Sequence, residues 1–372
     1  MHRRDKLSPF IVMDILAKAK EMEDVVHLEI GEPDLDPSPR VLEALERAVK
    51  ERKYFYTPSL GLWELREKIA DFYRKKYGVD VSPERVAVTT GTSGAFLVAY
   101  AVTMDAGDRI ALGDPSYPCY KNFAHLLDVE PEFVPISRET DYEIKADMLR
   151  GRKVKAVHIS SPANPTGNLY SPNTLKELAD YCDREGIYLI SDEIYHGLVY
   201  EGKEHTALEF SDRAIVINGF SKFFCMPGFR IGWAILPPEL IRSAEIVIQN
   251  VFISAPTLSQ YAALEAFDWE YLKKVRDIFS ERRKTLYEGV RELFEVDARP
   301  QGAFYVWANV SKYTDDSYSF ALKLLEEAGV AVTPGVDFGR NRTKEYIRLS
   351  YTRSVEELEE AVRRISNFLS SL

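Results

Sequence analysis

The sequence predicts an α/β protein with a large domain, in which helices flank a mostly parallel sheet, and a smaller α+β domain. Three observations support this fold class. The chain has 372 residues, more than one hydrophobic core usually organises. Hydrophobic residues make up 45% and charged residues 28%, which is typical of a folded protein. Short apolar runs rich in β-branched residues recur between residues 85 and 236, and helical patterns separate several of them.

Six apolar runs predict strands that are buried on both faces, because most of them do not alternate with polar residues. They are Val86–Thr90, Ile110–Leu112, Val154–Ile159, Ile187–Ile190, Ala214–Ile217 and Ile231–Leu236. The helices predicted between them are Ala95–Thr103, Tyr120–Leu127 and Thr174–Glu185, the last of which Gly186 ends. In such sheets ligands bind at the carboxyl ends of the strands.

The C-terminal third has a different pattern. Helical periodicity from Thr257 to Leu293 predicts one bent or broken helix. The elements expected after it are strands Ala303–Trp307 and Tyr346–Leu349 and helices Tyr318–Ala328 and Val355–Leu369. We therefore predict a large cofactor-binding domain of residues 33–274 and a small domain of residues 1–32 and 275–372, with the N-terminal helical segment packed on the latter.

Composition excludes several classes of function. The net charge of −10 and the lack of a basic cluster argue against nucleic acid or an anionic membrane as the partner. No apolar stretch approaches the roughly 18 residues that cross a bilayer, and Asp14 interrupts the only candidate for a leader. Cys119, Cys182 and Cys225 form no CxxC pair, so we expect no disulfide, no metal site and a cytoplasmic location.

Polar groups follow the predicted strands. Gly91-Thr92-Ser93-Gly94 leads into a helix, where free N–H groups favour an anion such as phosphate; a simple helix cap is the alternative. Tyr117 lies between prolines and is either a core aromatic or a surface on which a flat ring stacks. Asn164, also between prolines, is either a turn residue or an amide that binds a ligand oxygen.

Two charged side chains follow later strands. Asp192 at a buried strand end either caps a turn or pairs with a cation such as a protonated ring nitrogen, and Tyr195 reaches the same ligand. Lys222 is either a surface lysine or, in an apolar setting, a Schiff-base amine. Together with the phosphate cradle, the stacking aromatic and the oxygen-binding amide, these groups are the ones that pyridoxal 5′-phosphate requires.

Several motifs resemble those of the class I/II aminotransferases, the aspartate aminotransferase superfamily of fold type I. The motifs are Ser221-Lys222 with Arg230, Asp192-Glu193-Ile194-Tyr195, Asn164-Pro165-Thr166-Gly167, Gly31-Glu32-Pro33-Asp34, Tyr56-Thr57-Pro58, Gly302-Ala303-Phe304-Tyr305, Thr333-Pro334-Gly335 and Arg348-Leu349-Ser350. They span nearly the whole chain, and a chance match of all of them in this order is very improbable.

The resemblance implies a role for each matching position. Lys222 would carry the cofactor and move the substrate's Cα proton, and Asp192 would keep the ring nitrogen protonated. Asn164 and Tyr195 would bind the ring's phenolic oxygen, and Tyr117 would stack on the ring. The implied phosphate ligands are Thr92, Ser93, Ser221, Arg230 and, from a second subunit of a homodimer, Tyr56. The implied substrate contacts are Gly31, Tyr117, Asn164 and the carboxylate-binding Arg348.

The implied reaction is ping-pong transfer of the amino group of an L-amino acid, aspartate or another, to a 2-oxo acid such as 2-oxoglutarate. Some aspartate-using relatives carry Lys where this chain has Ser93, which argues against strict aspartate specificity. One alternative is a cysteine-conjugate β-lyase with the same cofactor. Another is a serine hydrolase built from Ser93, Asp192 and His205, and a third is a regulator without enzymatic activity.

Overall fold

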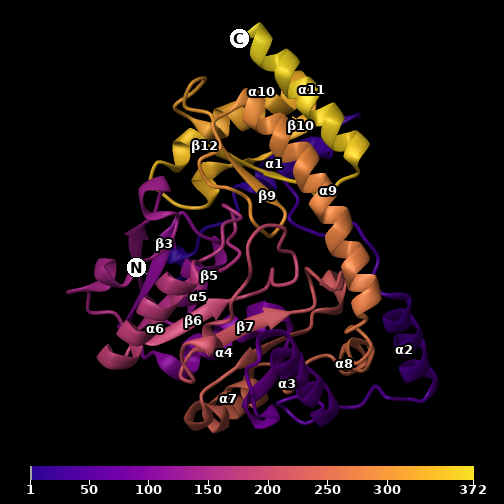
Figure 1. Ribbon diagram of the computed structural model, residues 1–372, viewed down its shortest axis with the longest axis vertical. Helices are drawn as coiled ribbons and strands as arrows, with labels where there is room; N and C mark the ends of the chain where they lie inside the picture. Colours follow the sequence, from indigo (N-terminus) through magenta and orange to yellow (C-terminus); the bar gives the residue numbers. More distant parts are fainter. Residues whose placement is uncertain (1) are drawn as a thin grey trace.

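The computed structural model describes residues 2–372, so Met1 of the predicted small domain lies outside the described residues. Seven strands form the main sheet in the order β2-β8-β7-β6-β5-β3-β4 (Figure 1). They are β2 (Val86–Thr89), β3 (Arg109–Asp114), β4 (Glu130–Pro135), β5 (Ala156–Ser160), β6 (Tyr188–Asp192), β7 (Ile215–Gly219) and β8 (Gly232–Ile235). Only β8 runs antiparallel to its neighbours, which confirms the mostly parallel sheet.

Helices cover both faces of this sheet. Alternate strand residues enter different hydrophobic clusters: Val86 and Val88 pack on one face with α3 and α6, whereas Ala87 packs on the other with α4, α5 and α7. The helices are α3 (Trp63–Tyr77), α4 (Gly91–Thr103), α5 (Cys119–Leu126), α6 (Pro172–Glu185) and α7 (Pro238–Val251), with α2 (Pro39–Lys50) and α8 (Thr257–Ala263) in contact at one side. Burial on both faces explains why the strand sequences are continuously apolar.

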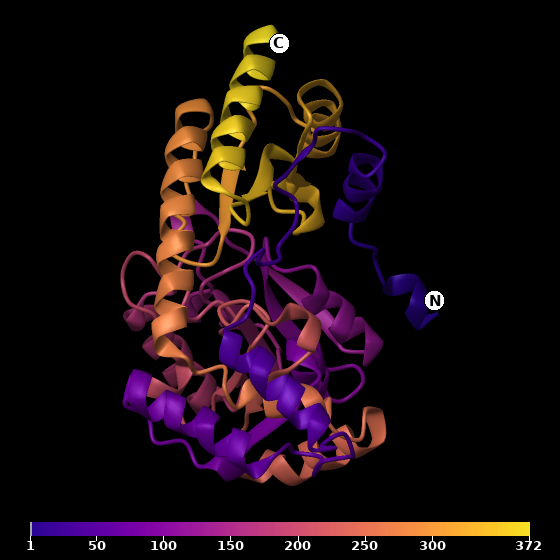
Figure 2. The ribbon, with the colours of Figure 1, turned by 90° about the vertical axis from the view of Figure 1, so that its right-hand side faces the viewer.

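A second layer contains the C-terminal elements. An antiparallel sheet has the order β11-β12-β9, and β1 pairs in parallel with β10. The strands are β1 (Val26–His27), β9 (Tyr305–Asn309), β10 (Val330–Ala331), β11 (Thr333–Pro334) and β12 (Tyr346–Ser350), and the helices are α1 (Val12–Ala19), α9 (Trp269–Leu293), α10 (Ser317–Ala328) and α11 (Val355–Ser371). Figure 2 shows α1 beside the C-terminal elements, and α1 contacts α10, β10 and β11, as predicted.

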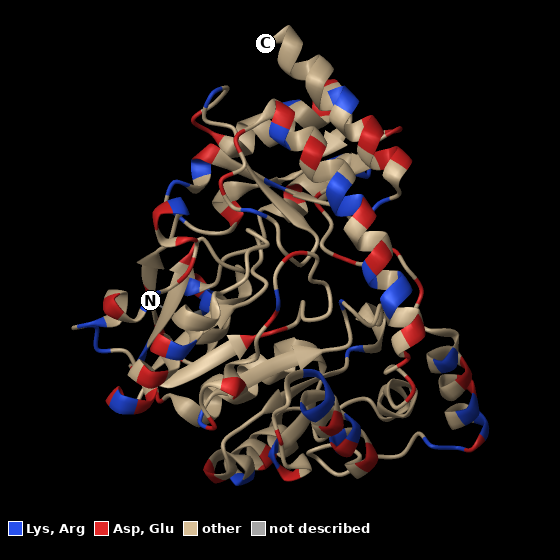
Figure 3. Ribbon diagram, in the orientation of Figure 1, with Lys and Arg blue, Asp and Glu red and all other residues tan. Residues whose placement is uncertain are grey.

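Short 3-10 helices lie in the segments that connect these elements. They are Arg3–Lys6, Pro83–Arg85, Arg138–Thr140, Ala146–Leu149, Ala207–Glu209, Pro227–Phe229, Gly335–Asp337 and Thr343–Glu345. Charged residues lie mainly along the outer helices, while the central strands contain few (Figure 3). None of the helices within residues 2–372 combines the length and apolar composition that crossing a membrane requires.

The structure corrects several predicted boundaries. Helix α4 begins at Gly91, so Thr92 and Ser93 belong to its first turn and not to a preceding loop. The strand predicted at 303–307 begins at 305, because Ala303 has a left-handed φ of 60° and bonds to Leu198. Of the two forms predicted for 257–293, a bent or a broken helix, the structure has the broken one, with α8 ending at Ala263 and Asp268 capping α9. Strand β4 was not predicted, because its two prolines and two glutamates suit an exposed edge strand and give no buried pattern.

Candidate active site

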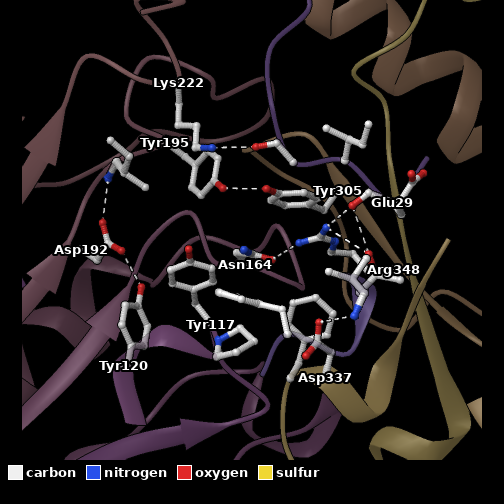
Figure 4. A pocket seen from close by; sticks show the side chains of 18 of the residues that line it. Glu29, Tyr117, Tyr120, Asn164, Asp192, Tyr195, Lys222, Tyr305, Asp337 and Arg348 are labelled. Atoms are coloured by element: carbon white, nitrogen blue, oxygen red, sulfur yellow. Dashed lines mark hydrogen bonds between the residues drawn. The ribbon is translucent and has the colours of Figure 1, made fainter. Parts of the chain in front are cut away.

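A cavity of about 290 Å³ lies where the carboxyl ends of β5, β6 and β7 face the small sheet. Eight of the twelve predicted site residues line it: Gly31, Thr92, Tyr117, Asn164, Asp192, Tyr195, Lys222 and Arg348. In Figure 4, Lys222, Asp192 and Arg348 approach the space from different sides, and Tyr117 points into it. The four predicted residues outside the lining are Tyr56, Ser93, Ser221 and Arg230.

Lys222 follows β7 and extends its amine into the cavity. The side chain is half-buried, and Nζ donates a hydrogen bond to the carbonyl oxygen of Gly31 at 2.6 Å. Burial lowers the pKa of Lys222 to about 8, and the charge of Arg348 acts in the same direction. An amine with this pKa has a much larger neutral fraction near physiological pH than an ordinary lysine, and the neutral form is the one that attacks an aldehyde and accepts a proton.

Asp192 ends β6 with its carboxylate 3% exposed. Tyr120 Oη donates to one carboxylate oxygen at 2.5 Å, and the backbone N–H of Ile194 donates to the other at 3.1 Å. Burial raises the pKa of Asp192 to about 6, although these hydrogen bonds and the charge of Lys222 pull the pKa down. Within the described residues, no lysine or arginine side chain bonds to the Asp192 carboxylate. A protonated ligand group beside it would therefore compensate the free-energy cost of burying its charge.

Arg348 lies on β12, opposite the strand ends, and is 6% exposed. Its Nη1 donates to Asn164 Oδ1 at 2.9 Å, while Nη2 donates to the Glu29 carbonyl at 2.8 Å and to Thr333 Oγ1 at 3.1 Å. The buried Nε has no partner among the described residues. None of these acceptors is a carboxylate, so the positive charge of the guanidinium is not neutralised by a bonded partner and can pair with an anionic ligand.

Tyr305 was not among the predicted site residues. Its ring lies 4.2 Å from the Arg348 guanidinium carbon, and its hydroxyl shares a hydrogen bond of 2.8 Å with Tyr195. A Cβ at Gly31 would collide with the Tyr305 hydroxyl, so any larger residue at this position would displace that buried hydroxyl. The signal in the sequence is the motif Gly302-Ala303-Phe304-Tyr305, which matches the family and ends on Tyr305.

A backbone cradle lies at the start of α4. A Cβ on Gly232 would come within 2.7 Å of the Gly91 carbonyl carbon and 2.9 Å of the Thr92 nitrogen. A Cβ on Gly91 would lie 2.5 Å from Arg230 Nη2, so the guanidinium packs directly against the helix N-terminus. The unpaired N–H groups of a first helical turn beside a guanidinium fit a phosphate. Together with Lys222 and Asp192, this arrangement fits pyridoxal phosphate.

The phosphate side is more open than the remainder of the site. Arg230 and Ser93 are exposed, Ser221 is half-buried, and Tyr56 is 80% exposed on a separate loop. The hydrolase alternative finds no support, because His205 bonds to Glu209 at 3.1 Å and Asp192 accepts from Tyr120, so neither joins Ser93 in a triad. The described residues therefore contain no hydrolase triad of that composition.

Comparison with known proteins agrees with the geometry. Residues 23–365 match the family described as aminotransferase class I and II. The chain is 43% identical to a (5-formylfuran-3-yl)methyl phosphate transaminase of Methanocaldococcus jannaschii, over 97% of each chain. It is 39% identical to a valine–pyruvate aminotransferase of Mycobacterium tuberculosis, over 99% of this chain and 98% of the relative.

Solved structures show the same similarity. An aminotransferase from Mycobacterium tuberculosis superposes with a TM-score of 0.96 at 38% identity, covering 100% of this chain and 99% of the other. Aspartate aminotransferase from Thermus thermophilus with maleate gives a TM-score of 0.92 at 34% identity, covering 98% of each chain. The predicted family is thereby confirmed: the chain belongs to the class I and II aminotransferases and is a pyridoxal-phosphate-dependent transferase.

Proposed function

We propose that this aminotransferase moves the amino group of an L-amino acid with an apolar side chain to a 2-oxo acid by a ping-pong mechanism. One observation carries the substrate class. Among the described residues that line the cavity, Lys222 and Arg348 are the only lysine and arginine. An apolar wall completes the lining with Phe10, Val12, Met13, Leu16, Ile30, Pro118 and Phe338. A second substrate carboxylate would find no cation of this chain, whereas an aliphatic or aromatic side chain would lose water-exposed apolar surface.

Arg348 would bind the α-carboxylate of both the amino acid and the oxo acid. Its charge has only neutral acceptors, and its Nε is unpaired. Asn164 Oδ1 and Thr333 Oγ1 orient the planar guanidinium, so that a carboxylate meets a prepared pair of donors. The use of one cation for both substrates suits a ping-pong reaction, in which they enter the same site in turn.

Lys222 Nζ would take the proton from the substrate Cα and return it during the transfer. Bound pyridoxal phosphate supplies a conjugated, electron-accepting ring that makes this proton acidic enough to remove. Asp192 would pair with the protonated ring nitrogen, and the Tyr120 hydrogen bond keeps the carboxylate in place. Asn164 and Tyr195 would face the phenolic oxygen, Tyr117 would stack on the ring, and Thr92, Ser93, Ser221, Arg230 and Tyr56 of a second copy would hold the phosphate.

The division into domains 33–274 and 1–32 with 275–372, the homodimer and the cytoplasmic location stay predictions. For the homodimer, the support is an exposed aromatic segment, in which Tyr54 is 47%, Phe55 67% and Tyr56 80% exposed. Burying these three rings against a second copy would remove a large apolar area from water.

Half-reactions of the purified holoenzyme with each of the twenty amino acids test the proposed substrate class. We expect valine, leucine, isoleucine, methionine and phenylalanine to convert the cofactor's visible absorbance faster than aspartate or glutamate does. A strong preference for the two dicarboxylic amino acids would contradict the proposal. Release of ammonia and pyruvate from cysteine conjugates without an oxo-acid acceptor would instead support the β-lyase alternative.

A further inference from the structure

We propose that Asp337 is a positioning residue that sets the substrate side-chain preference by holding α1 as one wall of the cavity. This inference rests on the apolar substrate class proposed above. Asp337 ends the 3-10 helix Gly335–Asp337 and is 4% exposed. One carboxylate oxygen accepts the backbone N–H of Ile11 at 2.9 Å, and the other accepts that of Val12 at 3.3 Å.

Helix α1 depends on this carboxylate at its N-terminus. Its N-cap residue is Ile11, whose side chain cannot accept a hydrogen bond. The first N–H groups of a helix have no partners within the helix, and a negative charge at that end is favourable. With eight residues, α1 is too short to be stable alone, so its contacts set its position. Asp337 supplies a cap that the local sequence lacks.

The packing of α1 explains how its position affects the substrate. Ile15 and Ala19 pack in the hydrophobic core, whereas Val12, Met13 and Leu16 line the cavity. Helical spacing places residues 12, 15, 16 and 19 along one continuous face with Met13 beside it, so the same face of α1 contacts both the core and the cavity. A shift of the N-terminal turn would therefore move the apolar wall, while the Ile15 and Ala19 contacts still hold the helix on the protein.

The segment around Asp337 also contacts the other groups that surround the substrate. The Phe338 ring lies 5.0 Å from the Arg348 guanidinium carbon. The carbonyl oxygen of Phe338 accepts the backbone N–H of Ser116 at 2.9 Å, next to the stacking residue Tyr117. One short segment thus links the apolar wall, the carboxylate-binding arginine and the ring-stacking loop. Loss of the Asp337 bonds to α1 would affect the first and leave the bonds of the other two in place.

Steady-state kinetics of the holoenzyme with a short and a long donor test this inference. In Asp337→Asn the amide keeps one acceptor and turns an NH2 group toward the second backbone N–H, so one of the two bonds to α1 is lost. We expect KM for leucine to rise about tenfold, with KM for alanine and both kcat values within about twofold. The matched control is Asp316→Asn, since Asp316 caps α10 through the N–H groups of Tyr318 and Ser319, away from the cavity. In this control both KM values should stay unchanged.

Equal increases in KM for alanine and leucine, or no increase for either, would overturn the inference. Amide hydrogen exchange of the holoenzyme supplies a readout that does not depend on the donor. Exchange in residues 12–19 should accelerate at least about tenfold in Asp337→Asn and stay unchanged in Asp316→Asn; unchanged exchange in both would also overturn it. If Asp337→Asn yields no folded holoenzyme, Asp337→Ser retains one acceptor and serves the same measurements.

A wild-type enzyme that rejects every apolar amino acid would contradict the proposed function before any variant is compared. The exchange measurement would still decide whether Asp337 holds α1, so the two failures are distinguishable.

Discussion

The two sides of the cavity are assembled in different ways. On the sheet side, Asn164, Asp192 and Lys222 follow β5, β6 and β7, which are successive along the chain and adjacent in the sheet. On the opposite side, Arg348 meets Glu29 and Thr333, so the carboxylate-binding group combines the first and the last parts of the chain. The sheet side is therefore a local product of the parallel topology, whereas the Arg348 side exists only when distant segments meet.

The two sides also differ in their electrostatics. On the sheet side, burial shifts the pKa of Lys222 down to about 8 and that of Asp192 up to about 6, which are the perturbed values typical of a reacting site. Arg348 bonds only to neutral oxygens. The sheet side would therefore carry the chemistry, with Lys222 moving the proton and Asp192 pairing with the ring nitrogen, whereas the Arg348 side would bind the substrate. Substitutions should accordingly lower kcat on the first side and raise KM on the second.

The largest effect should come from Lys222→Ala. We expect the turnover number to fall by at least about 10⁴-fold, because both the covalent attachment and the proton carrier are lost. The cofactor's visible absorbance should change at the same time. Rate measurements and absorbance spectra check this, with Lys203→Ala, a lysine exposed on another loop, as the control. Near-normal turnover would place the chemistry elsewhere.

Asp192→Asn should rank second. The amide cannot hold a positive charge on a ring nitrogen, so we expect kcat to fall by about 10³-fold while the cofactor stays bound. Tyr120→Phe, which removes only the hydrogen bond to the carboxylate, should cost about tenfold. Stopped-flow half-reactions with the cofactor content determined separately distinguish the two. A rise in KM with no change in kcat would instead show that Asp192 acts on substrate binding, as Arg348 does.

Arg348→Ala should act mainly on binding. We expect KM to rise about 10²-fold for every amino donor and oxo acid, since truncating a buried charge partner costs about 2 to 5 kcal/mol. Initial rates with alanine, leucine and aspartate check whether the effect is uniform. Arg353→Ala is the matched control, because Arg353 bonds to the His27 carbonyl and does not line the cavity. A loss confined to dicarboxylates would show that Arg348 binds a substrate side chain.

The smallest effect concerns stability and pH. Burial raises the pKa of Asp192 from its ordinary 3.8 to about 6, so the folded protein binds this proton more tightly than the unfolded chain does. The contribution of the protonated Asp192 to the free energy of unfolding is fully present below pH 3.8 and is lost as the pH rises through about 6. The free energy of unfolding of the cofactor-free Asp192→Asn variant should therefore exceed that of cofactor-free wild type by about 3 kcal/mol at pH 7.5, and the difference should vanish near pH 4.

Urea unfolding of both cofactor-free proteins between pH 4 and 8 measures this difference. Asp316→Asn offers the opposite sign, because hydrogen bonds from Ser319 and the first-turn amides lower the pKa of Asp316. That variant should lose stability at neutral pH and approach wild type in acid. A stability difference for Asp192→Asn that does not vary with pH would refute the desolvation argument.

Sequence alone was sufficient for the parts of the site that follow buried strands. The runs before Asn164, Asp192 and Lys222 are apolar on both faces, and parallel strands place their carboxyl ends together. Arg348 was predicted only through resemblance, since β12 has no pattern that pairs it with Glu29 or Thr333. Tyr305 and Asp337 were missed for the same reason: their partners Tyr195, Ile11 and Val12 are distant along the chain, and no local periodicity encodes those contacts.

The pairing of β1 with β10 has a consequence for biosynthesis. Val26 lies opposite Val330, so the first strand leaves the ribosome long before its partner exists. At translation rates of about 5 to 20 residues per second, this delay is about 15 to 60 s. During that time the apolar N-terminal segment has no native surface on which to dock, and it is a natural target for chaperones that bind nascent chains. Pulse-labelled ribosome complexes should therefore show this segment protease-sensitive after the seven-stranded sheet has become resistant.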